Sequence, residues 1–319
     1  MAEYINIRGQ SIEVVASDPA NPTIGQIWYN STSNTLKGGG FQAAAWATSN
    51  PMNTARSILG GAGIQTAALA FGGQPPTTGA TEEYDGNSWA NSNSLNTARF
   101  SLAGTGTQTA GLAFGGYTTT RVGSTEEYDG NSWAASNSMN TARSSPAGAG
   151  TQTAGLVFGG TAIPGIVGAT EEYDGNSWAA SNSMNTARSA LAGCGTQTAG
   201  LAFGGTAPPG IVGATEEYDG NSWTSSNSMN TIREDSGGAG TQTAALAFGG
   251  TPPITGATEE YDGTSWATSP GSLNTARNVL AGAGTQTAGL AFGGGTPTPT
   301  GATEEYNAAA PVIQTITAS

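Results

Sequence analysis

The sequence of 319 residues predicts an all-β protein in which small four-stranded sheets repeat along the chain. Two observations support this prediction. One short motif occurs six times, at spacings of 43 to 45 residues. Within each copy, large and small residues alternate with the period of a β-strand. Four strands in about 40–50 residues is the size of one blade of a radially repeated β-fold.

Each repeat is expected to begin its first strand just after an arginine and to end its second strand at Phe-Gly-Gly. In one copy, Leu112 and Phe114 should face one neighbouring sheet, because side chains alternate along a strand. The small residues Gly111 and Ala113 should face the other neighbour. The six arginines, each closing an Asn-Thr-Ala-Arg or Asn-Thr-Ile-Arg motif, are Arg56, Arg99, Arg143, Arg188, Arg233 and Arg277.

The third strand of each repeat should contain Thr-Glu-Glu-Tyr, and the fourth a tryptophan that follows an Asp-Gly hairpin turn. Adjacent glutamates point to opposite faces of a strand, so one glutamate per repeat can pair with an arginine. We predict structural Arg–Glu pairs and tryptophans that pack between blades. The alternatives are a ring of carboxylates around Ca²⁺ and sugar stacking on the tryptophans. The tryptophans are Trp46, Trp89, Trp133, Trp178, Trp223 and Trp266.

The two ends of the repeat array lack complementary parts of one blade. Trp46 marks a fourth strand with no first three strands before it, and Tyr306 marks a third strand with no fourth after it. The N-terminal strand should therefore complete the last blade and close a six-bladed β-propeller, which leaves no open edge there. A linear solenoid leaves this matched deficit unexplained. The expected parts are an N-terminal segment (1–40), a propeller (41–308) and a C-terminal tail (309–319).

The repeat resembles the kelch repeat of β-propellers. The residues that carry the resemblance in one copy are Arg143, Phe158-Gly159-Gly160, Tyr173-Asp174 and Trp178, and the resemblance covers roughly residues 41–308. Kelch propellers include both oxidases and binding modules, so this likeness implies a fold and not a function.

The N-terminal segment resembles the opening of virion proteins of marine bacteriophages. The matching residues are 18–22 (Asp-Pro-Ala-Asn-Pro), 25–30 (Gly-Gln-Ile-Trp-Tyr-Asn) and 35–37 (Thr-Leu-Lys). The Gly-, Thr- and Ala-rich repeats are also similar to phage kelch-like proteins. Together these likenesses imply a tail-associated virion appendage.

Residues 26–29 and 35–37 are expected to form a β-hairpin in this N-terminal segment. A segment of about 37 residues is too short for a good core of its own. It should therefore dock, either as a strap over the propeller or as an anchor to other virion proteins.

The composition excludes several classes of site. The chain has no histidine and a single cysteine, Cys194, which rules out histidine-based catalysis, copper ligation by histidine and any internal disulfide. We expect no cofactor and no metal, and a packing role for Cys194. Nine cationic residues against 22 anionic ones give a net charge of −13, which argues against a nucleic-acid partner. No apolar run is long enough to span a membrane.

Differences between the near-identical repeats gather in two segments. The loops between the second and third strands vary in length and chemistry, as do the residues just after each arginine. Both should lie on one face, around the mouth of the central channel, where recognition loops on rigid scaffolds are usually found. The candidate binding residues are Phe100, Tyr117, Arg121, Ile166, Val167, Ile211, Val212, Glu234 and Asp235.

We therefore expect a non-enzymatic virion appendage that displays these loops to a host-surface glycan or protein. The partners would be other virion or tail proteins through residues 1–40, and a homo-oligomer is compatible with the design. One alternative is a structural decoration or assembly subunit whose loops bind neighbouring subunits. The other is a glycan-active enzyme that uses Glu234 and Asp235, the only acids of the ring outside the repeated motifs.

Overall fold

The computed structural model describes residues 12–316, which form two compact units. The repeat unit is Ala45–Asn307, and the head unit combines the residues up to Ala44 with those from Ala308 onward. Both are built of strands. Residues 12–316 contain no helix that is long and apolar enough to cross a membrane.

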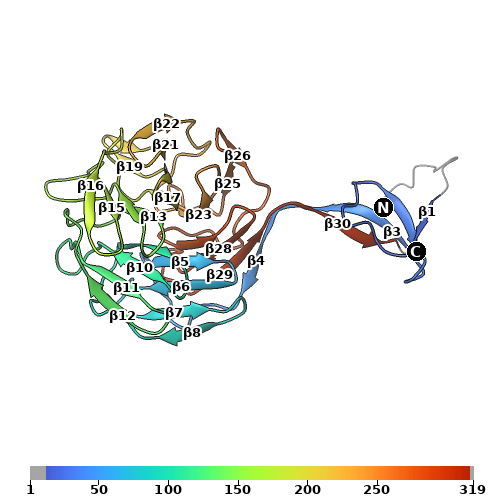
Figure 1. The fold of residues 1–319 in the computed structure, drawn as a ribbon, viewed down its shortest axis with the longest axis horizontal. Helices are drawn as coiled ribbons and strands as arrows, with labels where there is room; N and C mark the ends of the chain where they lie inside the picture. The colour runs from blue at the N-terminus through green and yellow to red at the C-terminus, as the bar shows by residue number, and fades with distance from the viewer. Residues whose placement is uncertain (1–11, 317–319) are drawn as a thin grey trace. The chain divides into compact units, whose positions relative to one another are not determined.

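Six four-stranded sheets make up the repeat unit and lie around a common centre (Figure 1). The first two are β5 (Gly60–Ile64), β6 (Ala67–Phe71), β7 (Thr81–Tyr84) and β8 (Trp89–Ser92), then β9 (Ala103–Gly106), β10 (Gly111–Phe114), β11 (Thr125–Tyr128) and β12 (Trp133–Ser136). The next two are β13 (Ala147–Gly150), β14 (Gly155–Phe158), β15 (Thr170–Tyr173) and β16 (Trp178–Ser181), then β17 (Ala192–Thr196), β18 (Ala199–Phe203), β21 (Thr215–Tyr218) and β22 (Trp223–Ser226). The last two are β23 (Gly237–Thr241), β24 (Ala244–Phe248), β25 (Thr258–Tyr261) and β26 (Trp266–Thr268), then β27 (Ala281–Gly284), β28 (Ala288–Phe292), β29 (Thr303–Asn307) and β4 (Ala45–Ser49).

Strand order within each sheet confirms the predicted repeated four-stranded, antiparallel arrangement. In one sheet Tyr128 of β11 lies opposite Trp133 of β12. The sheet that contains both ends of the array has the same register, with Tyr306 of β29 opposite Trp46 of β4. Beyond this pair, Asn307 lies opposite Ala45, so the chain enters and leaves the unit where an Asp-Gly turn joins the strands of the other sheets.

Neighbouring sheets pack a large face against a small one, as the alternation predicted. Leu112 and Phe114 of β10 cluster with Val157, Tyr173 and Trp178 of the following sheet, whereas Ala113 clusters with residues of the preceding sheet. The second residue of each innermost strand lies close against the preceding sheet and is glycine in all six sheets. A Cβ atom there would lie less than 3.0 Å from the phenylalanine ring of the preceding sheet. The six glycines are Gly61, Gly104, Gly148, Gly193, Gly238 and Gly282.

The head unit is a sheet of four strands in the order β1 (Glu13–Val15), β2 (Ile27–Asn30), β3 (Thr35–Gln42) and β30 (Ala310–Thr315). The β2–β3 hairpin is the one that the sequence predicted. Asp18 holds the loop before β2 in place. Its carboxylate accepts hydrogen bonds from Asn30 Nδ2 (2.6 Å) and Trp28 Nε1 (3.0 Å) and pairs with Lys37 Nζ (2.6 Å). The bonds from Asn30 and then Lys37 lower the pKa of Asp18 to about 2.

The observed division of the chain differs from the expected one. The head sheet extends to Gln42 rather than ending at residue 40, and the segment expected as a separate tail forms β30 in the same sheet. The physical reason is the free edge of β3, whose backbone groups β30 pairs along residues 37–42. Residues 1–11 of the expected anchor and 317–319 of the expected tail lie outside the described residues.

Candidate functional site

The two variable segments of each repeat lie side by side. In every repeat the residue after the arginine forms a β-bridge with the residue that follows Phe-Gly-Gly. In one repeat that following residue is itself a glycine. We call the surface formed by these segments and the loops between second and third strands the loop face. The six bridges are Ser57–Gln74, Phe100–Tyr117, Ser144–Thr161, Ser189–Thr206, Glu234–Thr251 and Asn278–Gly295.

Three of the candidate binding residues come together in one cluster. The Phe100 and Tyr117 rings lie 5.4 Å apart at 46°, and the two backbones exchange hydrogen bonds of 3.1 and 2.7 Å. Tyr117 also forms a bridge with Arg121 across the loop. All three side chains are half-buried, and Arg121 Nε has no hydrogen-bond partner among the described residues. This cluster presents two aromatic rings and a cation, which are the side chains most often found at binding hot spots.

The four aliphatic candidates occupy equivalent places in two neighbouring loops. Ile166 forms a bridge with Thr161, and Ile211 of β20 (Gly210–Ile211) pairs with Thr206 of β19 (Thr206–Ala207). The valine after each isoleucine donates its backbone N–H to a glycine carbonyl at 2.9 Å, Val167 to Gly160 and Val212 to Gly205. All four side chains are half-buried, so they support their loops as much as they present a surface.

Sequence reasoning missed the most exposed apolar residue of the loop face. Ile163 is 85% exposed, more than any other large apolar side chain among the described residues. A signal for it exists, because the neighbouring repeat has the same loop with Pro208 in its place. Ile163 is thus a further candidate contact residue.

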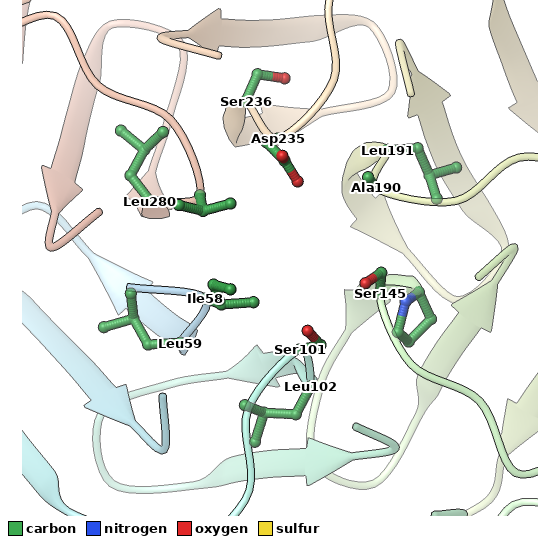
Figure 2. A pocket seen from close by; sticks show the side chains of 12 residues that line it. Ile58, Leu59, Ser101, Leu102, Ser145, Ala190, Leu191, Asp235, Ser236 and Leu280 are labelled. Atoms are coloured by element: carbon green, nitrogen blue, oxygen red, sulfur yellow. The ribbon is translucent and has the colours of Figure 1, made fainter. Parts of the chain in front are cut away.

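A cavity of about 120 Å³ opens at the centre of the repeat unit (Figure 2). Its rim consists of the second residue after each arginine, and the third residue forms the layer beneath. The rim residues all have left-handed backbones, with φ between 49° and 56°. They are Ile58, Ser101, Ser145, Ala190, Asp235 and Val279, and the layer beneath is Leu59, Leu102, Pro146, Leu191, Ser236 and Leu280.

Backbone hydrogen bonds join the six rim residues in a cycle. The N–H of each donates to the carbonyl of the rim residue in the preceding sheet, at 2.8 to 3.1 Å. The N–H of Ile58 donates to Val279, so the first and last sheets are joined in the same way as the others. A left-handed conformation costs about 1–2 kcal/mol for a residue other than glycine, and these bonds help to offset that cost. The rim is therefore held by its backbone, whatever side chain it carries.

Comparison with known proteins identifies the fold but not a family. No protein-family model and no curated protein matches the chain. The solved structure titled "Structure of YjhT" is similar with a TM-score of 0.67 and 12% identity, over 82% of this chain and 99% of that one. The fold is of the β-propeller type. This likeness carries no functional information, because one fold serves many functions.

The two acids suspected of catalysis have separate environments in the propeller. Asp235 lies on the cavity rim, where burial and then the charge of Glu234 raise its pKa to about 6. Glu234 is not among the cavity-lining residues, and its carboxylate accepts a hydrogen bond from the Thr206 hydroxyl of the neighbouring blade. Glycoside hydrolysis normally uses two carboxyl groups that flank one bond, whereas the cavity lining contains only one.

The repeated arginines and glutamates form buried structural pairs. In all six four-stranded sheets of the repeat unit the guanidinium lies 2.6 to 3.2 Å from the first glutamate of Thr-Glu-Glu-Tyr, and both side chains are at most 3% exposed. Burial lowers the pKa of these arginines, and the glutamate charge opposes that shift. The second glutamate accepts a hydrogen bond from the tyrosine hydroxyl of the following blade, as Glu305 does from Tyr84 at 2.6 Å.

The tryptophans bind neighbouring blades together. Each indole N–H donates to a threonine hydroxyl of the preceding blade at 2.9 Å, for example Trp133 to Thr81, and Trp89 does so to Thr303 across the junction of the chain ends. The rings also pack on phenylalanine and tyrosine, with centroids about 5 Å apart in Trp133 and Phe71. Their exposed fractions of 5–6% leave no surface for stacking on a sugar.

The aspartates of the Asp-Gly turns accept hydrogen bonds from backbone N–H groups of the same turn. Asp129 Oδ1 accepts the N–H groups of Asn131 (2.9 Å) and Ser132 (2.7 Å), and these bonds, that of Ser132 first, lower the pKa of the carboxyl below its ordinary value of 3.8. The aspartate thereby serves as the acceptor that closes the turn. The same shift occurs in Asp85, Asp174, Asp219 and Asp262.

We expect these turns to make the propeller less stable in acid. A carboxyl whose pKa is lower in the folded state contributes stability above pH 3.8, and this contribution is lost as the pH falls through the folded pKa. Urea unfolding between pH 6 and pH 2.5 measures the loss. Asp129→Asn keeps an oxygen acceptor but does not titrate, so the variant should lose less stability in acid than the wild-type chain. An identical pH profile would contradict the role given to Asp129.

Proposed function

We propose that this chain is a kelch-like β-propeller with six blades, closed by its N-terminal strand, and that it serves as a non-enzymatic bacteriophage virion appendage. Two features support the architecture: the pairing of β4 with β29 and the hydrogen-bond cycle of the rim. The resemblance of the N-terminal segment to virion proteins of marine phages supports the location on a virion.

The loop face is the proposed surface for host recognition. The six β-bridges carry this proposal, because they place both variable segments of every blade together on a scaffold that otherwise hardly changes. A host-surface glycan or protein would contact Phe100, Tyr117, Arg121 and Ile163, whose chemistry departs from the repeat. Several copies on one particle would raise the overall affinity without any new contact.

The head unit is the proposed attachment to other virion proteins. The register of its strands places Val14, Tyr29, Leu36 and Ile316 in one row across one face of the sheet. These side chains are exposed or half-buried in the described part of the chain. A row of apolar residues on a small sheet is the kind of surface that a partner protein covers.

Replacing the aromatic and cationic cluster should abolish binding to host cells. The full-length chain is displayed on beads in many copies and compared with the triple variant Phe100→Ala, Tyr117→Ala, Arg121→Ala. We expect at least about a tenfold loss of bound cells, because hot-spot side chains cost about 2 kcal/mol or more each when truncated.

A matched control changes the Asp-Gly turns, which lie at the end of the blades opposite the loop face. Asn87→Ala, Asn131→Ala and Asn176→Ala alter exposed side chains in three Asp-Gly turns and should leave binding unchanged. Equal binding by both triple variants would reject the loop face as the recognition surface. If the wild-type chain binds no host but its loop-face variant loses self-association, the chain is a structural decoration subunit instead.

A further inference from the structure

One position on the rim of the axial cavity differs from its equivalents in the other repeats, because it carries an acidic side chain. Five rim residues are uncharged, and the sixth is Asp235, the only ionisable side chain among the residues that line the cavity. Figure 2 shows its carboxylate directed toward the open centre. Within residues 12–316 that carboxylate has no hydrogen-bond or ion-pair partner, and the nearest charge in sequence, Glu234, has the same sign. A partly buried carboxylate without a partner is costly, and a cation in the cavity would relieve that cost.

Hydroxyl groups accompany the carboxylate. Ser101 lies opposite Asp235 in the order of the six blades, and Ser145 follows Ser101 around the rim. In the layer beneath, the other blades contribute leucine or proline, whereas the blade of Asp235 contributes Ser236. Figure 2 shows the Ser101 and Ser145 side chains on the side of the open centre. The open centre is thus faced by one carboxylate and two hydroxyls, whereas Figure 2 shows the Ser236 side chain farther out.

The other side chains that line the cavity are apolar. Ile58 and Val279 occupy adjacent places on the rim, and leucines form most of the layer beneath them. Apolar walls around a few convergent polar groups are typical of sites for small molecules. The volume of about 120 Å³ suits a group of only a few non-hydrogen atoms, since a cavity of ~150 Å³ admits benzene.

We propose that the axial cavity binds a primary ammonium group on a short aliphatic stem, with the Asp235 carboxylate as its counter-ion. The three N–H bonds of such a group match the carboxylate and the hydroxyls of Ser101 and Ser145, and the stem matches Ile58 and Val279. A hydrated inorganic cation would gain nothing from these apolar walls. The site goes beyond the attachment role, and its test uses no host cell, so either proposal can fail alone.

The test is a titration of the full-length chain with n-butylammonium, followed by the amide NMR shifts of Ile58, Ala190 and Val279. We expect saturable shifts at these residues at pH 8. Asp235→Asn should weaken the affinity about tenfold or more, because it removes a charge-assisted hydrogen bond. Asp235→Ala should do the same in an intact fold, because Ala190 already occupies the equivalent left-handed position. Glu13→Gln, which removes one negative charge from the head unit, should leave the affinity unchanged.

Further arms identify the chemistry. n-Butanol should bind more weakly than n-butylammonium, and potassium chloride at matched ionic strength should not displace the amine. Lowering the pH to 4.5 should weaken amine binding about tenfold or more, since protonation removes the carboxylate. An Nα-acetyl-lysine amide and glucosamine compared as ligands distinguish a lysine side chain from an amino sugar as the source. No saturable shifts, equal affinity in Asp235→Asn, or equal binding of n-butanol would each overturn the proposal.

Discussion

Replacing Arg188 with alanine should lower the free energy of unfolding by about 3–5 kcal/mol, because it leaves a buried carboxylate without its counter-charge. The Arg188 guanidinium contacts Glu216 Oε1 at 3.0 Å and also donates to the carbonyl groups of Gly204 (2.9 Å) and Ala214 (2.5 Å). Water cannot replace these bonds without opening the blade, because the side chain is fully buried. Reversible urea unfolding at pH 7 measures the loss.

The double variant Arg188→Leu, Glu216→Leu separates charge from hydrogen bonding. It removes both charges, which alone can be neutral or stabilising. However, Glu216 also accepts hydrogen bonds from the backbone N–H groups of Asn185 (2.7 Å) and Thr186 (3.3 Å). The double variant therefore leaves backbone groups without hydrogen-bond partners at both ends of the pair. We therefore expect it to remain about 2–4 kcal/mol less stable than wild type. A double variant as stable as wild type would show that only the charges matter.

These two roles of the Arg–Glu pair, charge pairing and hydrogen bonding, explain why the repeated sheets could be predicted from the sequence. Each Arg–Glu pair balances its own charges and also forms hydrogen bonds with backbone groups, including those of the connector between two blades. Few other residues could do both, so the motifs Asn-Thr-Ala-Arg and Thr-Glu-Glu-Tyr recur in copy after copy. The alternation in residues 111–114 likewise follows from packing that every blade shares. By contrast, β30 was not predicted, because residues 310–315 belong to no repeat and gain their partner from β3, which is distant in sequence.

The candidate site was predictable only in part, for a related reason. Phe100, Tyr117 and Arg121 stand out because they depart from a repeated background, and the structure brings them together. The rim of the cavity has no shared residue type, since its hydrogen bonds run between backbone groups. Nor does a strand pattern predict where Asp235 points, because its left-handed backbone (φ 56°) departs from the alternation of a regular strand. Sequence reasoning placed both Glu234 and Asp235 at the mouth of the channel, but it could not tell that Asp235 lines the cavity whereas Glu234 does not.

Replacing Phe114 with alanine should lower the free energy of unfolding by about 3–5 kcal/mol, the usual cost of deleting a buried aromatic ring. Phe114 is fully buried and meets the Trp178 ring of the following blade edge-on, with centroids 5.1 Å apart. Its ring also lies directly against Gly148, where a Cβ atom would be 2.5 Å from Phe114 Cζ. The deletion therefore opens a gap between two blades. Urea unfolding with tryptophan fluorescence measures the effect at this contact.

A compensating pair tests whether this contact sets the blade spacing. Gly148→Ala alone should cost about 1–3 kcal/mol, because the added methyl group collides with the ring. Phe114→Leu alone leaves part of the space empty, and the methyl group of Gly148→Ala would fill some of it. The combined variant should then be more stable than the sum of the two single effects implies, as is usual for residues in contact. Strictly additive effects would mean that the blades shift to accommodate either change, and that this contact does not set their spacing.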